Sequence, residues 1–297
     1  MNPVRRVACI GKFTAMHRGH RALVDAAAAQ GAPVVVRFSG MDVALGWQPR
    51  IPLLTPAGRS RVLDAWSRAV GVAIASLELP FARIRALDAG AFLDLLRDQH
   101  GIDAVVCGPD FRCGRSRSAG VAELAALSRA RSMRLEVVGP VLDRGRVISS
   151  SRIRTAVCRG RVAAAARMLD RPHELVGRVI HGEGRGHGLG FPTANLGHCA
   201  TLAPATGTYA ARALLGARRI AAAVNVGRNP TIGRGRALSI EAHLIDWSGD
   251  CYGADIRLQL LCRLRGERRF PDHAALSAQI AADVTAVREV VGSDAPV

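Results

Sequence analysis

A glycine-rich segment, residues 182–195, is the part of the chain whose composition points most directly to chemistry. Glycine occupies every second position at its start, at Gly182, Gly184, Gly186, Gly188 and Gly190. Because glycine packs nothing and loses the most conformational entropy on folding, this spacing predicts a backbone that flexes or closely approaches a ligand. A phosphate chain is one such ligand, and a plain glycine-rich hairpin is the alternative that this segment alone leaves open.

The same segment ends in Phe-Pro-Thr-Ala-Asn, which places two oxygen-bearing side chains behind the glycines. Pro192 fixes its own φ and biases Phe191 towards extended geometry. Thr193 and Asn195 are two residues apart, so they point to the same face of an extended segment. A hydroxyl and an amide placed side by side can serve a hard cation and its phosphate oxygens.

Two histidines three residues apart, His17 and His20, stand at the entry to an alanine-rich segment that we expect to be helical over 19–30. Both can address an anion at the helix N-terminus, where unpaired N–H groups and the helix dipole favour negative charge. Gly19 between them allows close approach. A His-x-Gly-His sequence is short, however, and in isolation a capping or metal role is equally compatible with it.

A third group of phosphate-compatible side chains lies at residues 148–154, which read Ile-Ser-Ser-Ser-Arg-Ile-Arg. Three hydroxyls and two guanidiniums directly before a predicted helix suit the oxygens of a triphosphate. The alternative is a serine N-cap followed by solvated arginines.

These groups need elements to position them, and the first half of the chain alternates between strand-like and helix-like segments. Such alternation predicts an α/β domain with a doubly wound parallel sheet. Asp110 follows the strand predicted at 104–107, and ligands bind at the carboxyl ends of strands in such sheets. The predicted strands are 7–11, 32–38, 72–77, 104–107 and 134–138, and the predicted helices are 19–30, 56–70, 89–100 and 121–131.

The second half is rich in short strands with Gly and Pro turns and has one terminal helix, predicted at 272–291. This pattern favours a small antiparallel β-barrel capped by that helix. A helix over 152–169 is expected to join the halves. We therefore expect an α/β domain at 1–157, a helical connector at 158–172 and a barrel domain at 173–297.

Five further motifs follow the glycine-rich segment in order and with short gaps. Over about residues 173–285 the chain resembles the riboflavin kinase family. The motifs are Gly-Thr-Tyr-Ala at 207–210, Asn-Val-Gly-Arg-Asn-Pro-Thr at 225–231, Glu-Ala-His-Leu-Ile-Asp at 241–246, Gly-Asp-Cys-Tyr-Gly at 249–253 and Leu-Arg-Gly-Glu-Arg-Arg-Phe at 264–270.

This resemblance implies transfer of the γ-phosphoryl group of ATP to the ribityl 5′-hydroxyl of riboflavin, giving FMN. It implies that Glu241 is the base and that the glycine-rich segment is a nucleotide flap. It also implies that Thr193 and Asn195 bind Mg²⁺ and ATP. Flavin contacts are implied for Asn225, Arg265 and Glu267.

Two features qualify the kinase assignment. A strand carboxylate such as Glu241 can also be a structural partner of a nearby arginine such as Arg257. His187 stands where the family commonly has arginine, and the loss of a permanent cation there is expected to weaken ATP binding rather than abolish it.

The first half, over about residues 7–157, resembles the adenylyltransferase half of the bifunctional bacterial riboflavin kinase/FAD synthetases. The resemblance implies attack of the FMN phosphate on the α-phosphorus of ATP, which releases pyrophosphate and forms FAD. His17 and His20 match the family's His-x-Gly-His and are the implied catalytic residues. The implied ATP contacts are Gly11, Phe13, Ser150, Ser151 and Arg154, with Lys12 as an added cation and Asp110, before Phe111, as a nucleotide or flavin contact.

Two departures from this family lie in the first half. Thr14 replaces the usual acidic residue before the first histidine, and Arg37-Phe-Ser-Gly-Met-Asp42 replaces the usual Thr-Phe-x-Pro-His-Pro. A second hypothesis is therefore a riboflavin kinase whose first domain is inactive or acts on a different flavin or nucleotide.

The charge of the chain raises a third hypothesis, nucleic-acid binding. The formal net charge is +17, and a basic surface binds polyphosphate through counterion release. The arginines are dispersed, however, and only 4% of residues are aromatic and able to stack on bases. We expect ATP and flavins as partners and no nucleic acid, with the charge helping to attract anionic nucleotides.

The apolar segments and the cysteines of the sequence indicate the cellular compartment. No apolar run approaches the roughly 18–20 residues of a membrane span, and no signal-peptide core is found, so we expect a cytoplasmic protein without a membrane partner. Seven cysteines without a Cys-x-x-Cys pair favour reduced thiols over a disulfide framework or zinc site. The sequence leaves the oligomeric state open.

Overall fold

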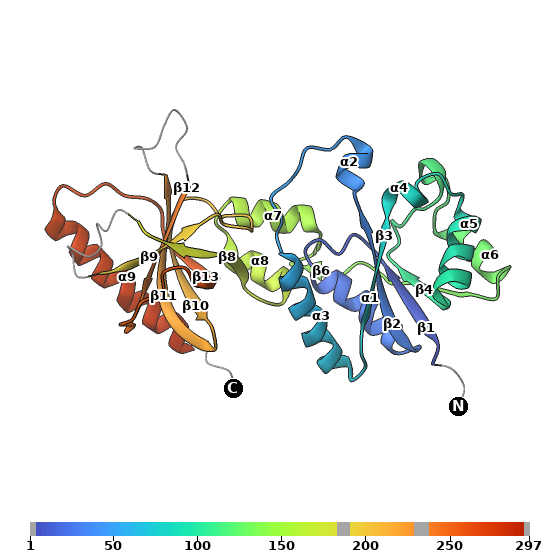
Figure 1. The fold of residues 1–297 in the computed structure, drawn as a ribbon, viewed down its shortest axis with the longest axis horizontal. Coiled ribbons are helices and arrows are strands. Elements are labelled where there is room, and N and C mark those ends of the chain that lie inside the picture. The colour runs from blue at the N-terminus through green and yellow to red at the C-terminus, as the bar shows by residue number, and fades with distance from the viewer. Residues whose placement is uncertain (1–3, 183–190, 229–237, 294–297) are drawn as a thin grey trace. The chain divides into compact units, whose positions relative to one another are not determined.

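The computed structural model describes residues 4–182, 191–228 and 238–293 of the chain (Figure 1). The flap glycines Gly184, Gly186, Gly188 and Gly190 and the departure at His187 lie outside the described residues, as does Asn229–Thr231. The chain forms two compact units. The first contains Met1–Arg50 and Pro56–Ser149, and the second contains Ile51–Thr55 and Ser150–Val297.

A five-stranded parallel sheet forms the centre of the first unit, in the order β3-β2-β1-β4-β5. The chain winds outward from β1 through β2 to β3, and then crosses to β4 and β5 on the other side. The direction of winding therefore changes between β1 and β4, and loops after such strands form a ligand crevice. The predicted doubly wound sheet is confirmed. Its strands are Arg6–Ile10 (β1), Ala32–Ser39 (β2), Ala75–Pro80 (β3), Ile102–Cys107 (β4) and Arg134–Val137 (β5).

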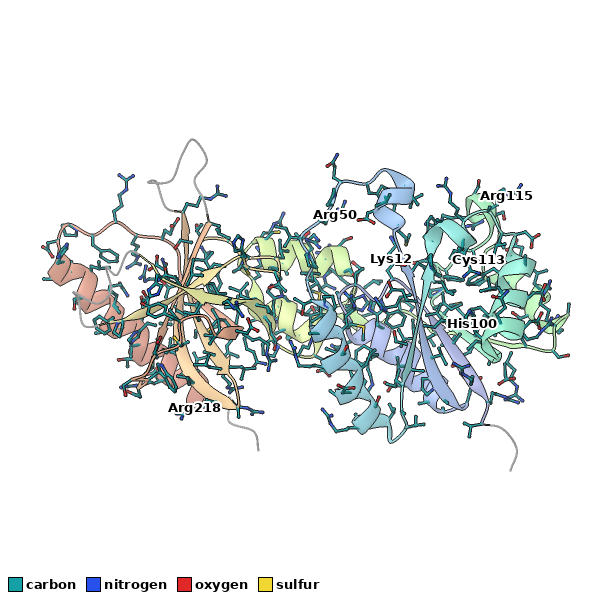
Figure 2. All side chains as sticks on the ribbon, in the orientation of Figure 1. Lys12, Arg50, His100, Cys113, Arg115 and Arg218 are labelled. Carbon is teal, nitrogen blue, oxygen red and sulfur yellow. The ribbon has the colours of Figure 1, made fainter. Side chains whose placement is uncertain are left out.

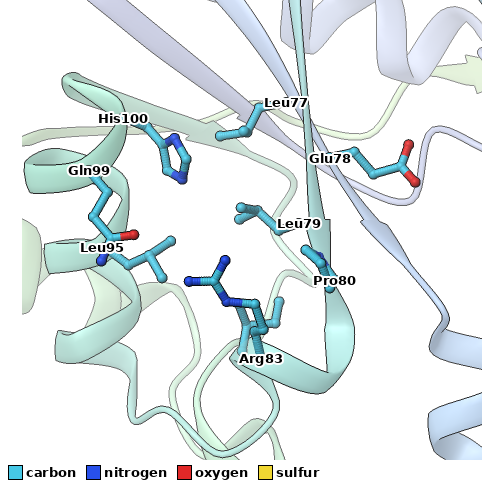
Figure 3. A pocket seen from close by; sticks show the side chains of 9 residues that line it. Leu77, Glu78, Leu79, Pro80, Arg83, Leu95, Gln99 and His100 are labelled. Carbon is cyan, nitrogen blue, oxygen red and sulfur yellow. The ribbon is translucent and has the colours of Figure 1, made fainter.

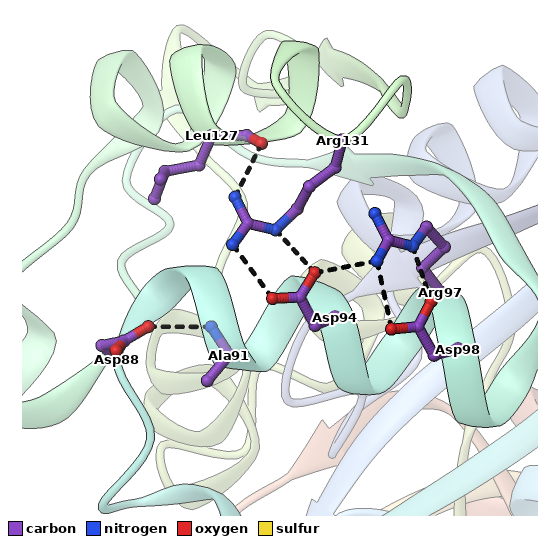
Figure 4. A network of polar contacts seen from close by, with 7 residues as sticks. All are labelled: Asp88, Ala91, Asp94, Arg97, Asp98, Leu127 and Arg131. Atoms are coloured by element: carbon purple, nitrogen blue, oxygen red, sulfur yellow. Dashed lines mark hydrogen bonds and ion pairs between the residues drawn. The ribbon is translucent and has the colours of Figure 1, made fainter.

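Helices connect these strands, and ion pairs hold some of them together. Figure 4 shows Arg131 bound to both carboxylate oxygens of Asp94, with Nε–Oδ1 at 2.8 Å and the second contact at 3.0 Å. The hydrogen bond from Arg131 lowers the pKa of Asp94. The pair ties α5 to the end of α6. The helices are Arg18–Ala28 (α1), Met41–Leu45 (α2), Pro56–Val70 (α3), Phe81–Ile84 (α4), Ala89–Asp94 (α5) and Val121–Arg129 (α6).

Two predicted elements of this unit were wrong in extent. The strand predicted at 72–77 begins only at Ala75, because the chain first returns through Gly71, at φ +73°, and the N–H of Ile74 bonds to Ser67 Oγ. The helix predicted at 89–100 is α-helical only to Asp94. A π-helical turn, η1 (Leu95–Gln99), completes it.

The joining helix was also predicted wrongly, because it is two helices, α7 (Ser150–Cys158) and α8 (Val162–Leu169). Gly160 separates them with φ +70°, a left-handed conformation that favours glycine. A Cβ at this position would lie 2.8 Å from Tyr209 Oη, so the close approach of Tyr209 also requires glycine. Helix α8 packs on two strands of the second unit, β8 (His173–Ile180) and β13 (Asp255–Arg265).

Six antiparallel strands close into a barrel in the second unit, in the order β10-β11-β12-β9-β8-β13. Alternate residues such as Val224, Ile240 and Ala242 fill its interior. Helix α9 (His273–Ser293) packs outside it through Val287 against Ala210 of β10 and Ala223 of β11. The predicted barrel and terminal helix are confirmed. The strands are His173–Ile180 (β8), Thr193–Gly197 (β9), Gly207–Leu215 (β10), Arg218–Arg228 (β11), Leu238–Leu244 (β12) and Asp255–Arg265 (β13).

A 3₁₀-helical turn, η2 (Arg115–Arg117), and a short hairpin, β6 (Leu142–Asp143) and β7 (Arg146–Val147), complete the described elements. Across the described ranges, we find no helix that is both long and apolar enough to cross a membrane.

Candidate active sites

Three polar residues of the barrel stand in one row across three neighbouring strands. Asn225 of β11 pairs with Glu241 of β12, and Glu241 pairs with Asn195 of β9. Paired residues on neighbouring strands project from the same face of a sheet. The residues before and after Glu241, Ile240 and Ala242, are buried in the barrel interior, so this row lies on the outer wall.

The first flap glycine, Gly182, lies directly against this row. A Cβ at position 182 would come within 2.1 Å of Asn195 Nδ2 and 2.4 Å of its Cγ, a separation that no real side chain tolerates. A side chain at position 182 would therefore displace either the Asn195 amide or the backbone beside it. The structure thus brings together the start of the predicted flap and one of the predicted Mg²⁺ and ATP residues.

Thr193 is held beside this position by the pairing of β9 with β12. It is the register partner of His243, whose Nδ1 is 2.9 Å from the carbonyl oxygen of Pro192. The ring of Phe191 meets the same imidazole edge-on, with centroids 5.4 Å apart. His243 thereby anchors the Phe-Pro-Thr segment, and Thr193 and Asn195 share the outer face of β9.

The Glu241 carboxylate has a different partner from the one considered in the sequence. The hydroxyl of Ser239 donates to its Oε1 at 2.9 Å. Arg257, the arginine considered as a structural partner, instead bonds to Glu174 at 3.3 Å. The alternative of a Glu241–Arg257 pair is therefore wrong, and Glu241 stands partly exposed beside Asn195.

Two of the implied flavin residues flank a glycine at the end of this wall. A Cβ at Gly227 would lie 3.2 Å from Glu267 Oε1 and 3.4 Å from Asn225 Nδ2. Both side chains are therefore close to Gly227, whose register partner is Ser239. The structure brings Asn225 and Glu267 to the same end of the outer wall as Glu241.

Arg265, the third implied flavin residue, is held by helix α9. Its Nε and one terminal nitrogen bond to Asp283 Oδ2 at 3.0 and 2.8 Å. The two side chains are only 16% and 7% exposed. Such a buried two-point contact fixes the loop after β13 onto the helix. A direct contact between Arg265 and flavin stays a prediction.

In the first unit, His17 and His20 cap the start of α1 reciprocally. The N–H of His20 donates to His17 Nδ1 at 3.4 Å, and the N–H of His17 donates to His20 Nδ1 at 3.3 Å. The two rings stack with centroids 3.8 Å apart, and the residues are 8% and 7% exposed. Because both Nδ1 atoms accept, each neutral imidazole carries its proton on Nε2.

The loop between β1 and α1 holds these rings through strained backbone. Phe13 and Met16 have φ values of 44° and 51°, although both side chains are fully buried. Left-handed geometry at such residues costs on the order of 1–3 kcal/mol each and is common at functional sites. The Phe13 ring stacks on His20 at 4.5 Å, and a Cβ at Gly11 would lie 3.1 Å from that ring. The predicted residues Gly11, Phe13 and His20 are thus one packed group.

Asp110 lies in the turn after β4, where the N–H of Phe111 bonds to the Gly108 carbonyl at 3.1 Å. Strands β1 and β4 are parallel neighbours, so their following loops emerge from one edge of the sheet. Asp110 is exposed there, at the edge that also carries the histidine loop.

The remaining predicted phosphate residues belong to the second unit. Ser150 and Ser151 are the first residues of α7, so their backbone N–H groups are at a helix N-terminus. Arg154, one turn later, is partly buried.

Comparison with known proteins matches both halves of the chain. The FAD synthetase family model matches residues 1–152, and the riboflavin kinase family model matches residues 169–291. A bifunctional riboflavin kinase/FMN adenylyltransferase of Escherichia coli K12 is 31% identical, covering 98% of this chain and 94% of that protein. The chain belongs to the bifunctional riboflavin kinase/FMN adenylyltransferase family.

Other relatives agree with this family. The Pseudomonas fluorescens bifunctional riboflavin kinase/FMN adenylyltransferase is 31% identical over 97% of the chain. An Arabidopsis thaliana chloroplastic FAD synthetase is 31% identical over 58% of it. A crystal structure from Streptococcus pneumoniae, described as a macrolide-efflux protein, has a TM-score of 0.83 and 28% identity over 97% of this chain.

Within this family framework, the structure reveals an aromatic pair to which sequence reasoning gave no role. His181 and Tyr252 stack with centroids 3.7 Å apart, and His181 directly precedes Gly182. Tyr252 is 51% exposed and sits in a turn in which its N–H bonds to Asp250 Oδ1 at 2.8 Å. The Gly-Asp-Cys-Tyr-Gly motif was the available signal, although its contact with position 181 depends on the tertiary structure.

A second missed feature lies where the chain departs from the bifunctional riboflavin kinase/FMN adenylyltransferase pattern. Arg37 is ion-paired with its register partner Glu78 on β3. After it, the chain forms α2 and presents Trp47, which is 50% exposed. Lys12, labelled in Figure 2, places its Nζ 5.1 Å from the centre of the Trp47 ring. Because Lys12 adjoins Phe13, this indole is linked to the histidine loop.

Proposed function

We propose that this protein phosphorylates riboflavin to FMN with ATP and then adenylylates FMN to FAD with release of pyrophosphate. Membership of the bifunctional family supports both activities, because models for both halves match the chain. One observation supports the kinase reaction at particular residues. Asn225, Glu241 and Asn195 form a row on the outer wall of the barrel.

In the kinase reaction, Glu241 accepts the proton of the riboflavin 5′-hydroxyl as that oxygen attacks the γ-phosphorus. A neutral alcohol needs such a base, and general-base catalysis contributes about 10²–10⁴-fold in rate. The hydrogen bond from Ser239 at 2.9 Å orients the carboxylate, and no arginine among the described residues pairs with it. Asn225 and Glu267, on either side of Gly227, position the flavin.

Thr193 and Asn195 fit a magnesium ion bound together with ATP. They contribute a hydroxyl and an amide oxygen on one face of β9, next to the Glu241 carboxylate. Mg²⁺ prefers oxygen ligands and is usually shared between one or two protein groups, water and substrate phosphates. When bound, the ion neutralises charge on the phosphate oxygens during transfer.

The His181–Tyr252 pair supplies a flat surface at the base of the flap. His181 directly precedes Gly182, whose backbone closely approaches Asn195, so the pair lies next in the chain to the proposed phosphate-binding position. Aromatic faces bind planar rings by stacking. We assign the pair to the base or sugar of ATP.

In adenylyl transfer, the FMN phosphate is already an anion, so the protein has to position the reactants and stabilise charge. The Nε2–H groups of His17 and His20 donate to ATP phosphate oxygens, because each Nδ1 is occupied by a backbone N–H. Ser150, Ser151 and Arg154 are assigned to ATP on their match to the family's motif alone. Asp110 positions the nucleotide or flavin.

Trp47 and Lys12 take part on the flavin side of this second reaction. The family segment expected after β2 is replaced in this chain, and an exposed indole follows the replacement. Its face can stack on the isoalloxazine ring, while Lys12 adds a cation near the phosphates. Trp47 thus compensates for the residues that the segment Arg37–Asp42 lacks.

Incubation of the protein with riboflavin, ATP and Mg²⁺, followed by chromatographic separation of flavins, tests the proposal. FAD is the expected end product, with FMN as a transient intermediate. FMN that never converts to FAD would support the alternative of a kinase with an inactive or altered first domain, which the departures at Thr14 and Arg37–Asp42 favour. Absence of any flavin product would overturn both.

The ligands and the cellular location of this protein are further parts of the proposal. ATP and flavins are the proposed ligands, with no role for nucleic acid, and a cytoplasmic location would give access to both. An oligonucleotide mobility shift that weakens with salt, in a preparation without flavin turnover, would instead support the nucleic-acid hypothesis.

A further inference from the structure

A hollow of about 120 Å³ lies over the edge of the first unit's sheet (Figure 3). Strand β3, helix α4 and the π-helical turn η1 surround it. Its apolar part is formed by Leu77, Leu79, Ile84 and Leu95, which belong to or pack against the core of this unit. Sites for drug-sized ligands occupy about 300–1,000 Å³, so this hollow is too small for a nucleotide or a flavin.

Three polar side chains border the hollow without a partner of their own. They are Arg83 of α4, Gln99 at the end of η1, and His100. Figure 3 shows the Arg83 guanidinium and the His100 ring directed into the hollow. Within residues 4–182, 191–228 and 238–293, nothing forms a hydrogen bond or ion pair with these three side chains.

The carboxylates of the surrounding elements are committed elsewhere. Glu78 of β3 turns its carboxylate away from the hollow and pairs with Arg37. On the α5–η1 helix, Asp94 binds Arg131, and Asp98 binds Arg97 at 2.6 Å (Figure 4). The positive charge of Arg83 is therefore not neutralised by any acid of β3, α4, α5 or η1.

We propose that this hollow is a binding site for a small organic carboxylate. The planar guanidinium of Arg83 matches a carboxylate through two parallel hydrogen bonds, which His100 and Gln99 can supplement. The apolar body of the ligand then rests on Leu79 and Ile84. A cavity of about 150 Å³ holds a molecule the size of benzene, so a hollow of about 120 Å³ limits the ligand to a short-chain acid.

This site is separate from the proposed adenylyl-transfer residues. His17, His20 and Asp110 follow the carboxyl ends of β1 and β4, whereas His100 precedes the amino end of β4. None of the nine lining residues belongs to the histidine loop or to the turn after β4. Binding here is therefore expected without competition from ATP or FMN.

The test uses butyrate as the probe, with the full-length protein and its Arg83→Gln and Arg68→Gln variants. Arg68, on α3, is an exposed arginine that does not line the hollow and serves as the matched control. Saturation-transfer NMR detects the probe, and the ring-proton shifts of His100, assigned with His100→Gln, report the site. Butyrate is expected to bind the unmodified protein and Arg68→Gln with equal affinity.

Arg83→Gln is expected to weaken butyrate binding about tenfold or more, because a hydrogen bond to a charged group is lost. Butyramide, which has the same shape without charge, is expected not to bind, and saturating ADP is expected to leave butyrate binding unchanged. Equal binding by Arg83→Gln, equal binding of butyramide, or no shift at His100 would each overturn the proposal. Inorganic phosphate that binds as well as butyrate would overturn the assignment to a carboxylate with an apolar body.

Discussion

Asn195 of β9 and Glu241 of β12 face each other across an antiparallel strand pair, so an amide and a carboxylate project together from the outer wall of the barrel. Their neighbours Ala194 and Ala242 are buried, which prevents the register from slipping by one residue without exposing the core. The barrel core therefore sets the spacing between a proposed metal ligand and the proposed base. This relationship makes the kinase proposal testable one residue at a time.

Glu241→Gln is expected to reduce FMN formation from riboflavin by at least about 100-fold, because a glutamine cannot accept the proton. FAD formation from supplied FMN is expected to be unchanged. Both rates are measured by chromatography of the flavins, with Glu174→Gln as a control that removes a barrel carboxylate paired with Arg257. Equal loss of both activities in Glu241→Gln would mean that Glu241 is structural.

Gly182→Ala is expected to raise KM for ATP in the kinase reaction by about tenfold or more. The added methyl would lie 2.1 Å from Asn195 Nδ2, so either the flap or the Asn195 side chain has to move. Gly292→Ala is the matched control, since a Cβ there meets nothing within 4 Å. Steady-state kinetics that show the same KM in both variants would contradict a role for the contact between Gly182 and Asn195.

These contacts also show which parts of the structure the sequence could predict. The alternation of buried and exposed residues along the strands, together with the Gly and Pro turns, is local information, and it sufficed for both domain folds. The break at Gly160 depends on Tyr209, which is far away in the sequence and leaves no room for a Cβ. The contact of His181 with Tyr252 is likewise tertiary, so neither feature has a local signal.

For the site residues, motif resemblance and geometry contributed differently. The order of motifs predicted Glu241, Asn195 and Asn225 as functional, and the strand register explains how they meet. Arg265 had the same motif support, yet its guanidinium faces Asp283 on α9. A motif specifies that a residue type matters, whereas only packing distinguishes a ligand contact from a residue that supports the loop.

His20→Ala is expected to lower FAD formation from FMN by about 10²–10³-fold, the loss typical of one preorganised charge-stabilising donor. Riboflavin phosphorylation is expected to continue. Because His20 also caps α1, the alanine variant is further expected to lose about 1 kcal/mol of stability.

A second variant separates these two effects of His20. The Oδ1 atom of His20→Asn can still accept the His17 N–H, but the side chain lacks the Nε2–H donor. Thermal unfolding is expected to recover towards the unmodified protein while FAD formation stays low. Recovery of FAD formation together with stability would show that His20 acts only as a cap.

Trp47→Ala is expected to raise KM for FMN in adenylyl transfer by about tenfold and to leave KM for ATP unchanged, since stacking of a planar ring on an aromatic side chain contributes about 1–3 kcal/mol. The control is Trp247→Ala, which removes a similar indole held by Arg218 at 5.0 Å in the barrel unit. Initial rates at varied FMN and varied ATP distinguish the two constants. Equal increases in both would argue for a general loosening of the loop.

His173 makes the stability of the barrel unit depend on pH. Burial lowers the pKa of His173 below its ordinary value of 6.5, and Arg171 and Arg154 add to this effect against the opposing hydrogen bond to Leu202. Its Nε2 contacts the Leu202 carbonyl at 2.6 Å, while its buried Nδ1 has no hydrogen-bond partner among the described residues. The folded barrel therefore holds this imidazole neutral.

As the pH falls below about 6.5, the unfolded chain takes up a proton at His173 that the folded chain excludes, so stability falls with pH. The contribution of this residue to stability is expected to be present in full above about pH 7.5 and to decrease as the pH falls through the unfolded-state pKa of 6.5. Denaturant unfolding followed by tryptophan emission measures it, in a Trp47→Phe/Trp66→Phe background that leaves Trp247 of the barrel unit as the reporter. His173→Gln, whose amide can still donate to the Leu202 carbonyl, is expected to lose this part of the pH dependence. The control His273→Gln, which changes an exposed histidine, is expected to retain it. If the free energy of unfolding varied with pH in the same way in the unmodified protein and in both variants, His173 would be ruled out as the source.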